Sequence, residues 1–376
     1  MRVLIATVTA GAGHLQAAAA LEEAWRALRP EDFVERVDVL DFTPRVFKKA
    51  YSQGYVNLVE HAPELWGFFF KKTDNAALAR KLTKLRRSLS HLPARKFAGF
   101  VKRFHPDAVV CTHFLPLEIL GRLEEKSREP AQPCCVCVVT DFEAHALWME
   151  PVVDFYCVAA EETMARLTAR GVPEADVAVT GIPIAAKFAA RPAASAARKL
   201  LGLRDDLPTV LVLSGGFGMG PVAKILAALD QMSQAFQMAV VCGRNRELRR
   251  ELAGQDWRHP THVLGFVTNM HDWMTAAVLI VTKPGGLTAS EALAIGRPLV
   301  IIDPIPGQET ANADFLLERG AAIKLNSVDD LPHRVGGLLG SRKLAAMARA
   351  ARALGRPQAA MEICREVARR WEQRKG

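Results

Sequence analysis

The sequence has no run of about eighteen apolar residues, which is close to the length that a membrane-spanning helix needs. Its first residues are typical of a strand, not of a charged segment followed by an apolar run and a cleavage site, so we expect no signal peptide. Cysteines are few and odd in number, seven in all, and Cys134, Cys135 and Cys137 fall in one apolar run. We therefore expect free thiols in a cytoplasmic protein whose membrane contact is peripheral.

Several kinds of site are also missing. No Cys/His spacing resembles a zinc site, no Asp-x-Asp motif is present to hold Mg²⁺, and no RNA-binding motif is visible. A net charge of +9 favours an anionic partner, whether nucleic acid, nucleotide or lipid headgroup. The basic residues between positions 71 and 103 alternate with leucines, which argues against nucleic acid. We expect no metal, no other cofactor and no nucleic-acid partner.

Length and periodicity predict two domains, because 376 residues, half of them hydrophobic, exceed what one core normally holds. Apolar strands alternate with helical spacing, and the alternation restarts at residue 209. We expect an α/β protein with two doubly wound, Rossmann-like domains and a cleft between them. The expected parts are residues 1–184 as the first domain, 185–207 as a linker, 208–356 as the second domain, and 357–376 as a helix that crosses back to the first domain.

Residues 278–314 contain the most informative pattern, a strand, a glycine pair, a helix and a second strand. Gly285 and Gly286 leave backbone N–H groups free at a helix start, where an anion such as phosphate binds well. Glu291, expected in the first helical turn, is suited to accept both hydroxyls of a ribose. Gln308 and Glu309 follow the next strand, where parallel sheets place their ligands. Together these groups predict a nucleotide-sugar site.

A structural explanation of the same residues stays open. Thr288-x-x-Glu291 is also the pattern of a capping box, in which the glutamate satisfies the helix's own N–H groups and binds no ligand. Gln308 and Glu309 are equally compatible with solvated loop residues. Only the combination of the glycine pair, Glu291 and the second loop favours a ligand.

Polar residues follow three strands of the first domain. His14 comes after residues 3–8, His113 after 107–112, and Asp141, His145 and Trp148 after 135–139. The carboxyl ends of parallel strands share one edge of a sheet, so these side chains are expected to lie at that edge. His14 is a candidate base or a structural histidine. Asp141 is a candidate to orient an acceptor or a histidine, or it caps a turn.

Residues 51–72 combine aromatic and basic side chains. Such a segment fits an interfacial helix, whose apolar face enters lipid while its cations meet anionic headgroups. An amphipathic helix packed on its own domain has the same pattern. The candidate acceptor and membrane residues are Tyr55, Trp66, Phe68, Phe69, Phe70, Lys71 and Lys72.

The chain contains eight short motifs, and their order along the sequence is more specific than any one of them. They are Gly11-Ala12-Gly13-His14, Thr140-Asp141-Phe142, Thr180-Gly181-Ile182-Pro183-Ile184, Gly215-Gly216-Phe217-Gly218-Met219-Gly220, Cys242-Gly243-Arg244-Asn245, Gly265-Phe266-Val267-Thr268-Asn269-Met270, Thr282-Lys283-Pro284-Gly285-Gly286 and Pro306-Gly307-Gln308-Glu309. With them the chain resembles glycosyltransferase family 28, in particular the diacylglycerol glucosyltransferases and monogalactosyldiacylglycerol synthases.

The resemblance implies a GT-B fold, with the acceptor and membrane in the first half and a UDP-sugar in the second. It implies that His14 is the general base, that Glu291 binds ribose, and that residues 266–270 border the uracil. It also implies that Gln308 and Glu309 bind the sugar. The donor residues that we expect are Gly13, Gly216, Gly218, Met219, Arg244, Asn245, Phe266, Val267, Asn269, Met270, Gly285, Gly286, Thr288, Glu291, Gln308 and Glu309.

One position departs from the family pattern. Relatives often carry a basic residue after the Gly-Ile-Pro-Ile motif that can reach the diphosphate, whereas Ala185 stands here. Lys187 or another cation must then substitute, or that contact is absent.

The expected reaction is inverting transfer of glucose or galactose from UDP-sugar to 1,2-diacylglycerol, giving a β-glycosyl-diacylglycerol at the inner face of the cell membrane. His14 and Asp141 are the expected catalytic residues. Two other activities share the architecture: an N-acetylglucosaminyltransferase acting on a lipid-linked peptidoglycan precursor, and a UDP-N-acetylglucosamine 2-epimerase.

Overall fold

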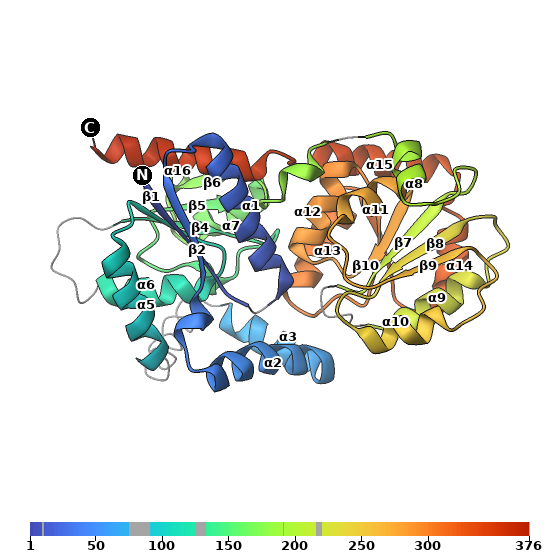
Figure 1. The fold of residues 1–376 in the computed structure, drawn as a ribbon, viewed down its shortest axis with the longest axis horizontal. Coiled ribbons are helices and arrows are strands. Elements are labelled where there is room, and N and C mark those ends of the chain that lie inside the picture. Colours follow the sequence, from blue (N-terminus) through green and yellow to red (C-terminus); the bar gives the residue numbers. More distant parts are fainter. Residues whose placement is uncertain (10, 75–90, 125–132, 191, 216–219, 376) are drawn as a thin grey trace. The chain divides into compact units, whose positions relative to one another are not determined.

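The computed structural model describes residues 1–9, 11–74, 91–124, 133–190, 192–215 and 220–375, without the side chains of residues 52, 53, 55–57, 59, 60, 91–94, 123 and 124. The chain forms two compact units by its own contacts (Figure 1). The first contains Met1–Ala186, Pro306–Gln308 and Gln358–Gly376, and the second contains Lys187–Ile305 and Glu309–Pro357.

The first unit is built on a parallel sheet of six strands in the order β2-β1-β3-β4-β5-β6. β1 is the second strand from one edge, because the chain first adds β2 on one side of it and later β3 on the other, which makes the unit doubly wound. The strands are β1 (Arg2–Thr7), β2 (Phe33–Asp38), β3 (Ala108–Cys111), β4 (Cys134–Val138), β5 (Phe155–Val158) and β6 (Val177–Val179).

Alternate residues of β1 belong to different cores, as the twofold period of a strand requires. Val3 and Ile5 pack with α1 (Ala12–Leu28) and α16 (Ala359–Lys375), whereas Leu4 and Ala6 belong to the core on the other face. That second core is completed by α5 (His91–Phe104), α6 (Phe114–Glu124) and α7 (Glu161–Ala169). The sheet is thus covered on both faces, which explains why its strands are nearly all apolar.

The second unit repeats this plan with the strand order β12-β11-β10-β7-β8-β9. Its strands are β7 (Thr209–Leu213), β8 (Gln237–Val241), β9 (Thr261–Leu264), β10 (Leu279–Thr282), β11 (Leu299–Ile302) and β12 (Ala322–Leu325). Its helices are α8 (Ala194–Leu200), α9 (Val222–Asp230), α10 (Arg246–Ala253), α11 (Met270–Ala276), α12 (Gly286–Ile295), α13 (Gln308–Glu318), α14 (Leu331–Gly336) and α15 (Arg342–Leu354).

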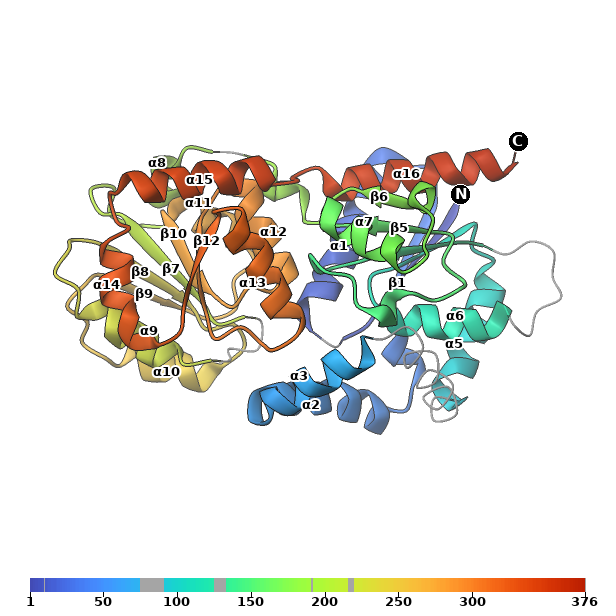
Figure 2. The same ribbon diagram turned by 180° about the vertical axis from the view of Figure 1, so that it is seen from behind.

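Two segments near the expected boundaries are helical and packed. α16 packs against α1 of the first unit, where Ile363 and Cys364 are fully buried (Figure 2). The residues expected to form a linker include α8, which packs against α11 of the second unit. All seven cysteines are buried free thiols.

The aromatic segment forms two helices, α2 (Arg45–His61) and α3 (Pro63–Thr73), which pack against each other. Pro63 starts α3 because proline suits the first turn of a helix. None of the residues of α3 is buried, yet α3 packs against α2 of the same unit, so both explanations of this segment, an interfacial helix and an amphipathic helix packed on its own domain, stay open.

Candidate active site

His14 lies in the first turn of α1, directly after β1. The turn between them needs Gly11, whose φ of 149° is rarely adopted by other residues. His14 Nδ1 lies 2.9 Å from the carbonyl oxygen of Thr112 and 2.9 Å from Thr140 Oγ1. A carbonyl oxygen can only accept, so Nδ1 carries the proton and donates it there. The neutral imidazole therefore keeps the lone pair of Nε2 free to accept a proton.

The surroundings of His14 also fix its charge. Burial lowers the pKa of His14 to about 4, and the hydrogen bond to the Thr112 carbonyl opposes this shift only partly. The side chain is consequently neutral near pH 7. A neutral histidine with a protonated Nδ1 is the form that a general base requires.

Aromatic rings surround His14. The His113 ring contacts it edge-on with centroids 4.7 Å apart, and the Trp148 ring lies 6.3 Å away. His113 is itself held in place because its Nδ1 accepts a hydrogen bond from the Leu115 backbone N–H at 3.0 Å. The residues that follow β3 and β4 therefore meet His14, as the positions of the strand ends predict.

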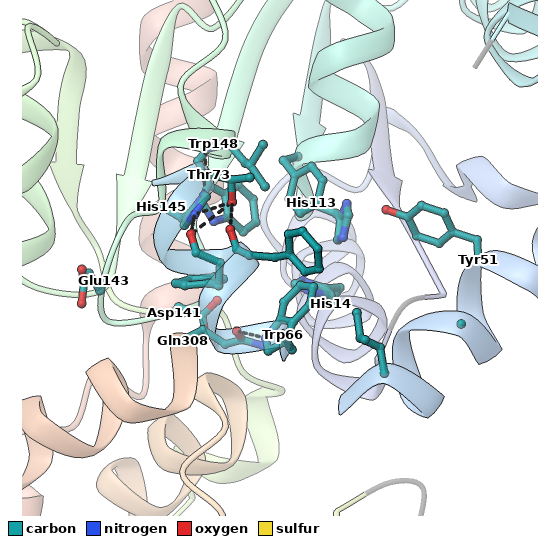
Figure 3. A pocket seen from close by; sticks show the side chains of 16 residues that line it. His14, Tyr51, Trp66, Thr73, His113, Asp141, Glu143, His145, Trp148 and Gln308 are labelled. Atoms are coloured by element: carbon teal, nitrogen blue, oxygen red, sulfur yellow. Dashed lines mark hydrogen bonds between the residues drawn. The ribbon is translucent and has the colours of Figure 1, made fainter. Parts of the chain in front are cut away.

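A cavity of about 400 Å³ opens beside His14 within the first unit (Figure 3). Its wall combines aromatic and apolar side chains with polar ones. It is lined by His14, Tyr51, Gly54, Leu58, Trp66, Phe69, Phe70, Thr73, His113, Phe114, Asp141, Glu143, His145, Leu147, Trp148 and Gln308. A cavity of this composition is suited to a largely apolar ligand that also carries a polar group.

Asp141 lines this cavity with His14. The orientation of His14 comes from the Thr112 carbonyl and the Thr140 hydroxyl. For Asp141, orienting an acceptor or a histidine and capping a turn all stay predictions. No sequence pattern indicates the Thr112 contact, because any residue can supply a backbone carbonyl.

Trp66, Phe69 and Phe70 of α3 line the cavity, whereas Phe68, Lys71 and Lys72 do not. Phe68 and Phe69 are 55% and 50% exposed, and the Lys72 ammonium lies 5.0 Å from the centre of the Phe68 ring. α3 thus exposes Phe68 and Lys72 to solvent and places Trp66 and Phe70 in the cavity wall, while Phe69 is both exposed and part of that wall. The side chain of Tyr55 lies outside the described residues.

In the second unit, α12 begins at Gly286 and its N-cap is Gly285, with no side-chain cap. The expectation that Glu291 lies in the first turn is wrong, and so is the capping-box explanation, because Thr288 is only the third residue of the helix and Glu291 the sixth. Glu291 is half-buried, and burial raises its pKa to about 8, opposed by the charge of Lys187. Because the carboxyl group of Glu291 does not cap the N–H groups of α12, it is available for a ligand.

Lys187 contacts the loop that follows β9. Its Nζ donates to the Thr268 carbonyl at 2.6 Å, and its charge acts on Glu291. Lys187 therefore joins the two segments expected to border the nucleoside. Lys187 is the candidate to substitute for the basic residue that relatives often carry at the position of Ala185.

The remaining residues of the 266–270 loop lie at the start of α11. Phe266 is 56% exposed, with the Arg244 guanidinium 5.6 Å from the centre of its ring. Asn269 is the N-cap of α11 and Met270 its first residue, with Val267 between Phe266 and Thr268. Asn245 has a structural role in addition to any ligand role, because its Oδ1 caps α10 by accepting from the Leu248 N–H at 2.9 Å.

The glycine loop after β7 ends at Gly220, whose φ is 105°. A methyl group there would lie 3.3 Å from Lys283 Cε, so the loop passes close to a lysine that also pairs with Asp303 at 3.3 Å. Gly216, Gly218 and Met219 lie outside the described residues. Gly13, by contrast, is the second residue of α1 in the first unit.

Gln308 and Glu309 begin α13 and are both half-buried. Glu309 Oε2 accepts from the Ile305 N–H at 2.8 Å and closes the turn around Gly307, whose φ is 99°. Trp66 Nε1 donates to Gln308 Oε1 at 3.2 Å, and Gln308 is grouped with the first unit. Neither side chain is a simple solvated loop residue.

Among the described residues, no group of three His, Cys, Asp or Glu side chains could hold a metal ion. In that same part of the chain, no helix is both long and apolar enough to cross a bilayer.

Comparison with known proteins identifies the family. Residues 14–184 match the family model "Monogalactosyldiacylglycerol (MGDG) synthase", and residues 209–361 match "Glycosyltransferase family 28 C-terminal domain". The chain is 31% identical to a chloroplastic monogalactosyldiacylglycerol synthase of Spinacia oleracea, over 97% of this chain and 72% of that protein. It is 28% identical to a processive diacylglycerol beta-glucosyltransferase of Bacillus pumilus, over 90% of this chain and 86% of that protein.

Among solved structures, the crystal structure of MurG from Acinetobacter baumannii resembles this chain with a TM-score of 0.58. The two are 17% identical, and the match covers 98% of this chain and 99% of MurG. That likeness shows a shared fold, which is the GT-B fold of two Rossmann-like units. Taken with both family models and with the spinach relative, the chain belongs to glycosyltransferase family 28, in the group of monogalactosyldiacylglycerol synthases and diacylglycerol glucosyltransferases.

Proposed function

We propose that this glycosyltransferase moves a hexose from a UDP-sugar to the free hydroxyl of 1,2-diacylglycerol and inverts the anomeric configuration. The observation that carries the proposal is the Nε2 of His14, which is free to accept a proton beside an aromatic cavity. Acyl chains and one hydroxyl are what such a cavity accommodates. The spinach and Bacillus relatives, whose names specify diacylglycerol products or acceptors, support the same choice.

The chemical step follows from the chemistry of the reacting groups. The acceptor oxygen attacks the anomeric carbon as its proton passes to His14 Nε2, and the bond between that carbon and the diphosphate breaks on the opposite face. The β-linked product and UDP result. Asp141 is proposed to hold the acceptor near its hydroxyl, and no metal is proposed to take part.

The second unit is proposed to hold the donor. The N-terminus of α12, which begins at Gly286, is proposed to offer the backbone N–H groups of its first turn and the positive end of the helix dipole to the diphosphate. Glu291 accepts from the ribose hydroxyls, and Phe266 borders the uracil. Gln308 and Glu309 are proposed to contact the hexose. These groups suit either configuration at C4, so glucose and galactose both remain candidates.

We further propose that α3 docks peripherally on an anionic membrane at the inner face of the cell membrane. Changing Phe68 and Phe69 together to serine is expected to weaken binding to anionic vesicles at least about ten-fold, because burying one phenylalanine contributes roughly 1.5–3 kcal/mol. Vesicle sedimentation measures this. Leu200→Ser, which removes an apolar side chain 70% exposed in the second unit, is the matched control. Equal vesicle binding by the double variant and the wild type would contradict the docking role of α3.

The activity itself is tested by offering UDP-glucose and UDP-galactose separately to the protein on anionic vesicles that contain diacylglycerol. A glycosyl-diacylglycerol from one donor is the expected product and identifies the sugar. Release of UDP without a lipid product rules out diacylglycerol as the acceptor. In that case the two alternatives, transfer to a peptidoglycan precursor and epimerisation of UDP-N-acetylglucosamine, are tested next.

A further inference from the structure

Polar contacts attach the C-terminal end of α3 to the first unit. α3 supplies Trp66, Phe69, Phe70 and Thr73 to the cavity wall, yet it buries none of its own residues. Its N-terminal half is held by packing on α2 and by the hydrogen bond from Trp66 to Gln308. The contacts that begin at its C-cap, Asp74, hold the other end.

Asp74 joins α3 to two other segments of the first unit. Its Oδ1 accepts from the Ala146 N–H at 2.8 Å. Arg170, the C-cap of α7, donates to both carboxylate oxygens at 2.8 Å each, and Arg166 Nη2 donates to Oδ2 at 2.5 Å. A bidentate arginine pair of this kind is among the strongest polar contacts in proteins.

The charge state of Asp74 agrees with this geometry. Burial acts to raise its pKa, but the hydrogen bonds from Arg170 and the Ala146 N–H outweigh it and hold the pKa at about 2. The carboxylate is therefore ionised at every pH at which an assay is practical.

His145 makes a second attachment at the same end of α3 (Figure 3). Its Nδ1 accepts from the Leu147 N–H at 3.1 Å, so Nε2 carries the proton and donates to the Phe70 carbonyl at 2.9 Å. The Phe70 and His145 rings lie 4.3 Å apart. His145 thus fixes both the backbone and the ring of a residue in the cavity wall.

We propose that Asp74, Arg170 and His145 form a latch that holds α3 in place as one wall of the acceptor cavity, with Asp74 as a positioning residue for the acceptor. The inference rests on the proposed function. Asp74 is not part of the cavity lining; it acts through Phe70 and Thr73. Releasing the latch lets α3 move away from the cavity, which lowers the affinity for the acyl chains and leaves the donor site and His14 as they were.

Asp74→Asn tests the latch, because the amide still accepts from the Ala146 N–H but loses the ionic pairs with both arginines. The KM for diacylglycerol is expected to rise about ten-fold or more, the loss typical of a hydrogen bond to a charged group. The kcat at saturating acceptor and the Kd for UDP are expected to stay within about two-fold. Asp74→Glu, which restores the charge, is expected to recover part of the KM.

The matched control is Asp32→Asn. Asp32 is also a buried carboxylate, paired with Arg29 at 2.8 Å, and it is not part of the cavity lining. Its loss is expected to lower the Tm without changing the KM for diacylglycerol. A purely structural role for Asp74 predicts the same behaviour in both variants, and that result would overturn the latch.

Hydrogen exchange of the backbone amides of α3, residues 64–73, provides a readout that does not depend on the identity of the acceptor. Faster exchange in Asp74→Asn, but not in Asp32→Asn, is the expected result. Unchanged exchange in α3 excludes the latch even if the protein glycosylates diacylglycerol. Faster exchange of α3 in Asp74→Asn, together with no glycolipid product from the wild type, supports the latch and excludes diacylglycerol as the acceptor.

Discussion

Replacing His14 with alanine is expected to lower glycosyl transfer by about 10²- to 10⁴-fold, the usual contribution of a general base. The imidazole is the basic group whose tautomer the fold fixes, since Nδ1 donates to the Thr112 carbonyl at 2.9 Å and Nε2 is left to accept. Without it, the acceptor proton has to pass to water in a cavity lined mainly by aromatic rings. UDP binding is expected to change little, because the donor residues proposed to bind UDP belong to the second unit and His14 belongs to the first.

Initial rates with saturating UDP-sugar and diacylglycerol vesicles measure this effect. His14→Gln keeps much of the size of the ring but cannot take up a proton at neutral pH, so it is expected to be as inactive as the alanine variant. His333→Ala, at an exposed position of α14, is the control. A folded His14→Ala protein that binds UDP and transfers sugar at the wild-type rate would remove the base assignment.

The sequence predicted the elements of the fold closely where apolar runs are long and bounded by turns. The alternation of strands and helices was expected to restart at residue 209, and β7 begins there. β2 ends at Asp38, whose side chain accepts from the Leu40 N–H at 2.9 Å and starts a 3-10 turn. Valine and leucine after Asp38 look like strand residues, and only the side-chain cap explains why they are not.

In the candidate active site, too, sequence spacing predicts some features and not others. His14, His113, Asp141 and His145 each follow a strand, so their meeting at one sheet edge could be predicted. The start of α12 could not, because Thr288 and Gly285 are both acceptable N-caps and only the backbone conformation chooses between them. The contacts of Asp74 with α7 join residues 92 and 96 positions apart, and no local pattern indicates such a pair.

Above pH 8, where Glu291 is ionised, replacing it with glutamine is expected to weaken UDP binding by about 10- to 100-fold. A carboxylate accepts from both ribose hydroxyls, and losing hydrogen bonds to a charged group typically costs roughly 1.5–3 kcal/mol each. Isothermal titration of UDP measures the effect, with Glu247→Gln at an exposed position of α10 as the control. Equal affinities for the two glutamine variants would exclude Glu291 from the nucleoside site.

The same residue predicts a dependence on pH that separates a binding role from a structural one. Burial raises the pKa of Glu291 from 4.5 to about 8 in the folded protein, so between these values the folded state holds a proton that the unfolded state has released. The stability contributed by this group is therefore fully present below pH 4.5 and is lost as the pH rises through 8. Glutamine does not titrate, so the Tm of Glu291→Gln relative to the wild type is expected to rise between pH 6 and pH 9.

Donor affinity should change in the opposite direction, because the ribose hydroxyls bind the ionised carboxylate better than the protonated acid. Wild-type affinity for UDP is expected to increase from pH 6 to pH 8 with release of a proton, and the affinity of Glu291→Gln is expected to stay flat apart from the titration of UDP itself. Lys187→Met removes the charge that opposes the pKa shift, so it should move the wild-type profile to higher pH. Ionised Glu291 thus destabilises the second unit at the pH where it is expected to bind UDP best. Folding alone would favour glutamine at this position, so binding of the ligand explains the glutamate.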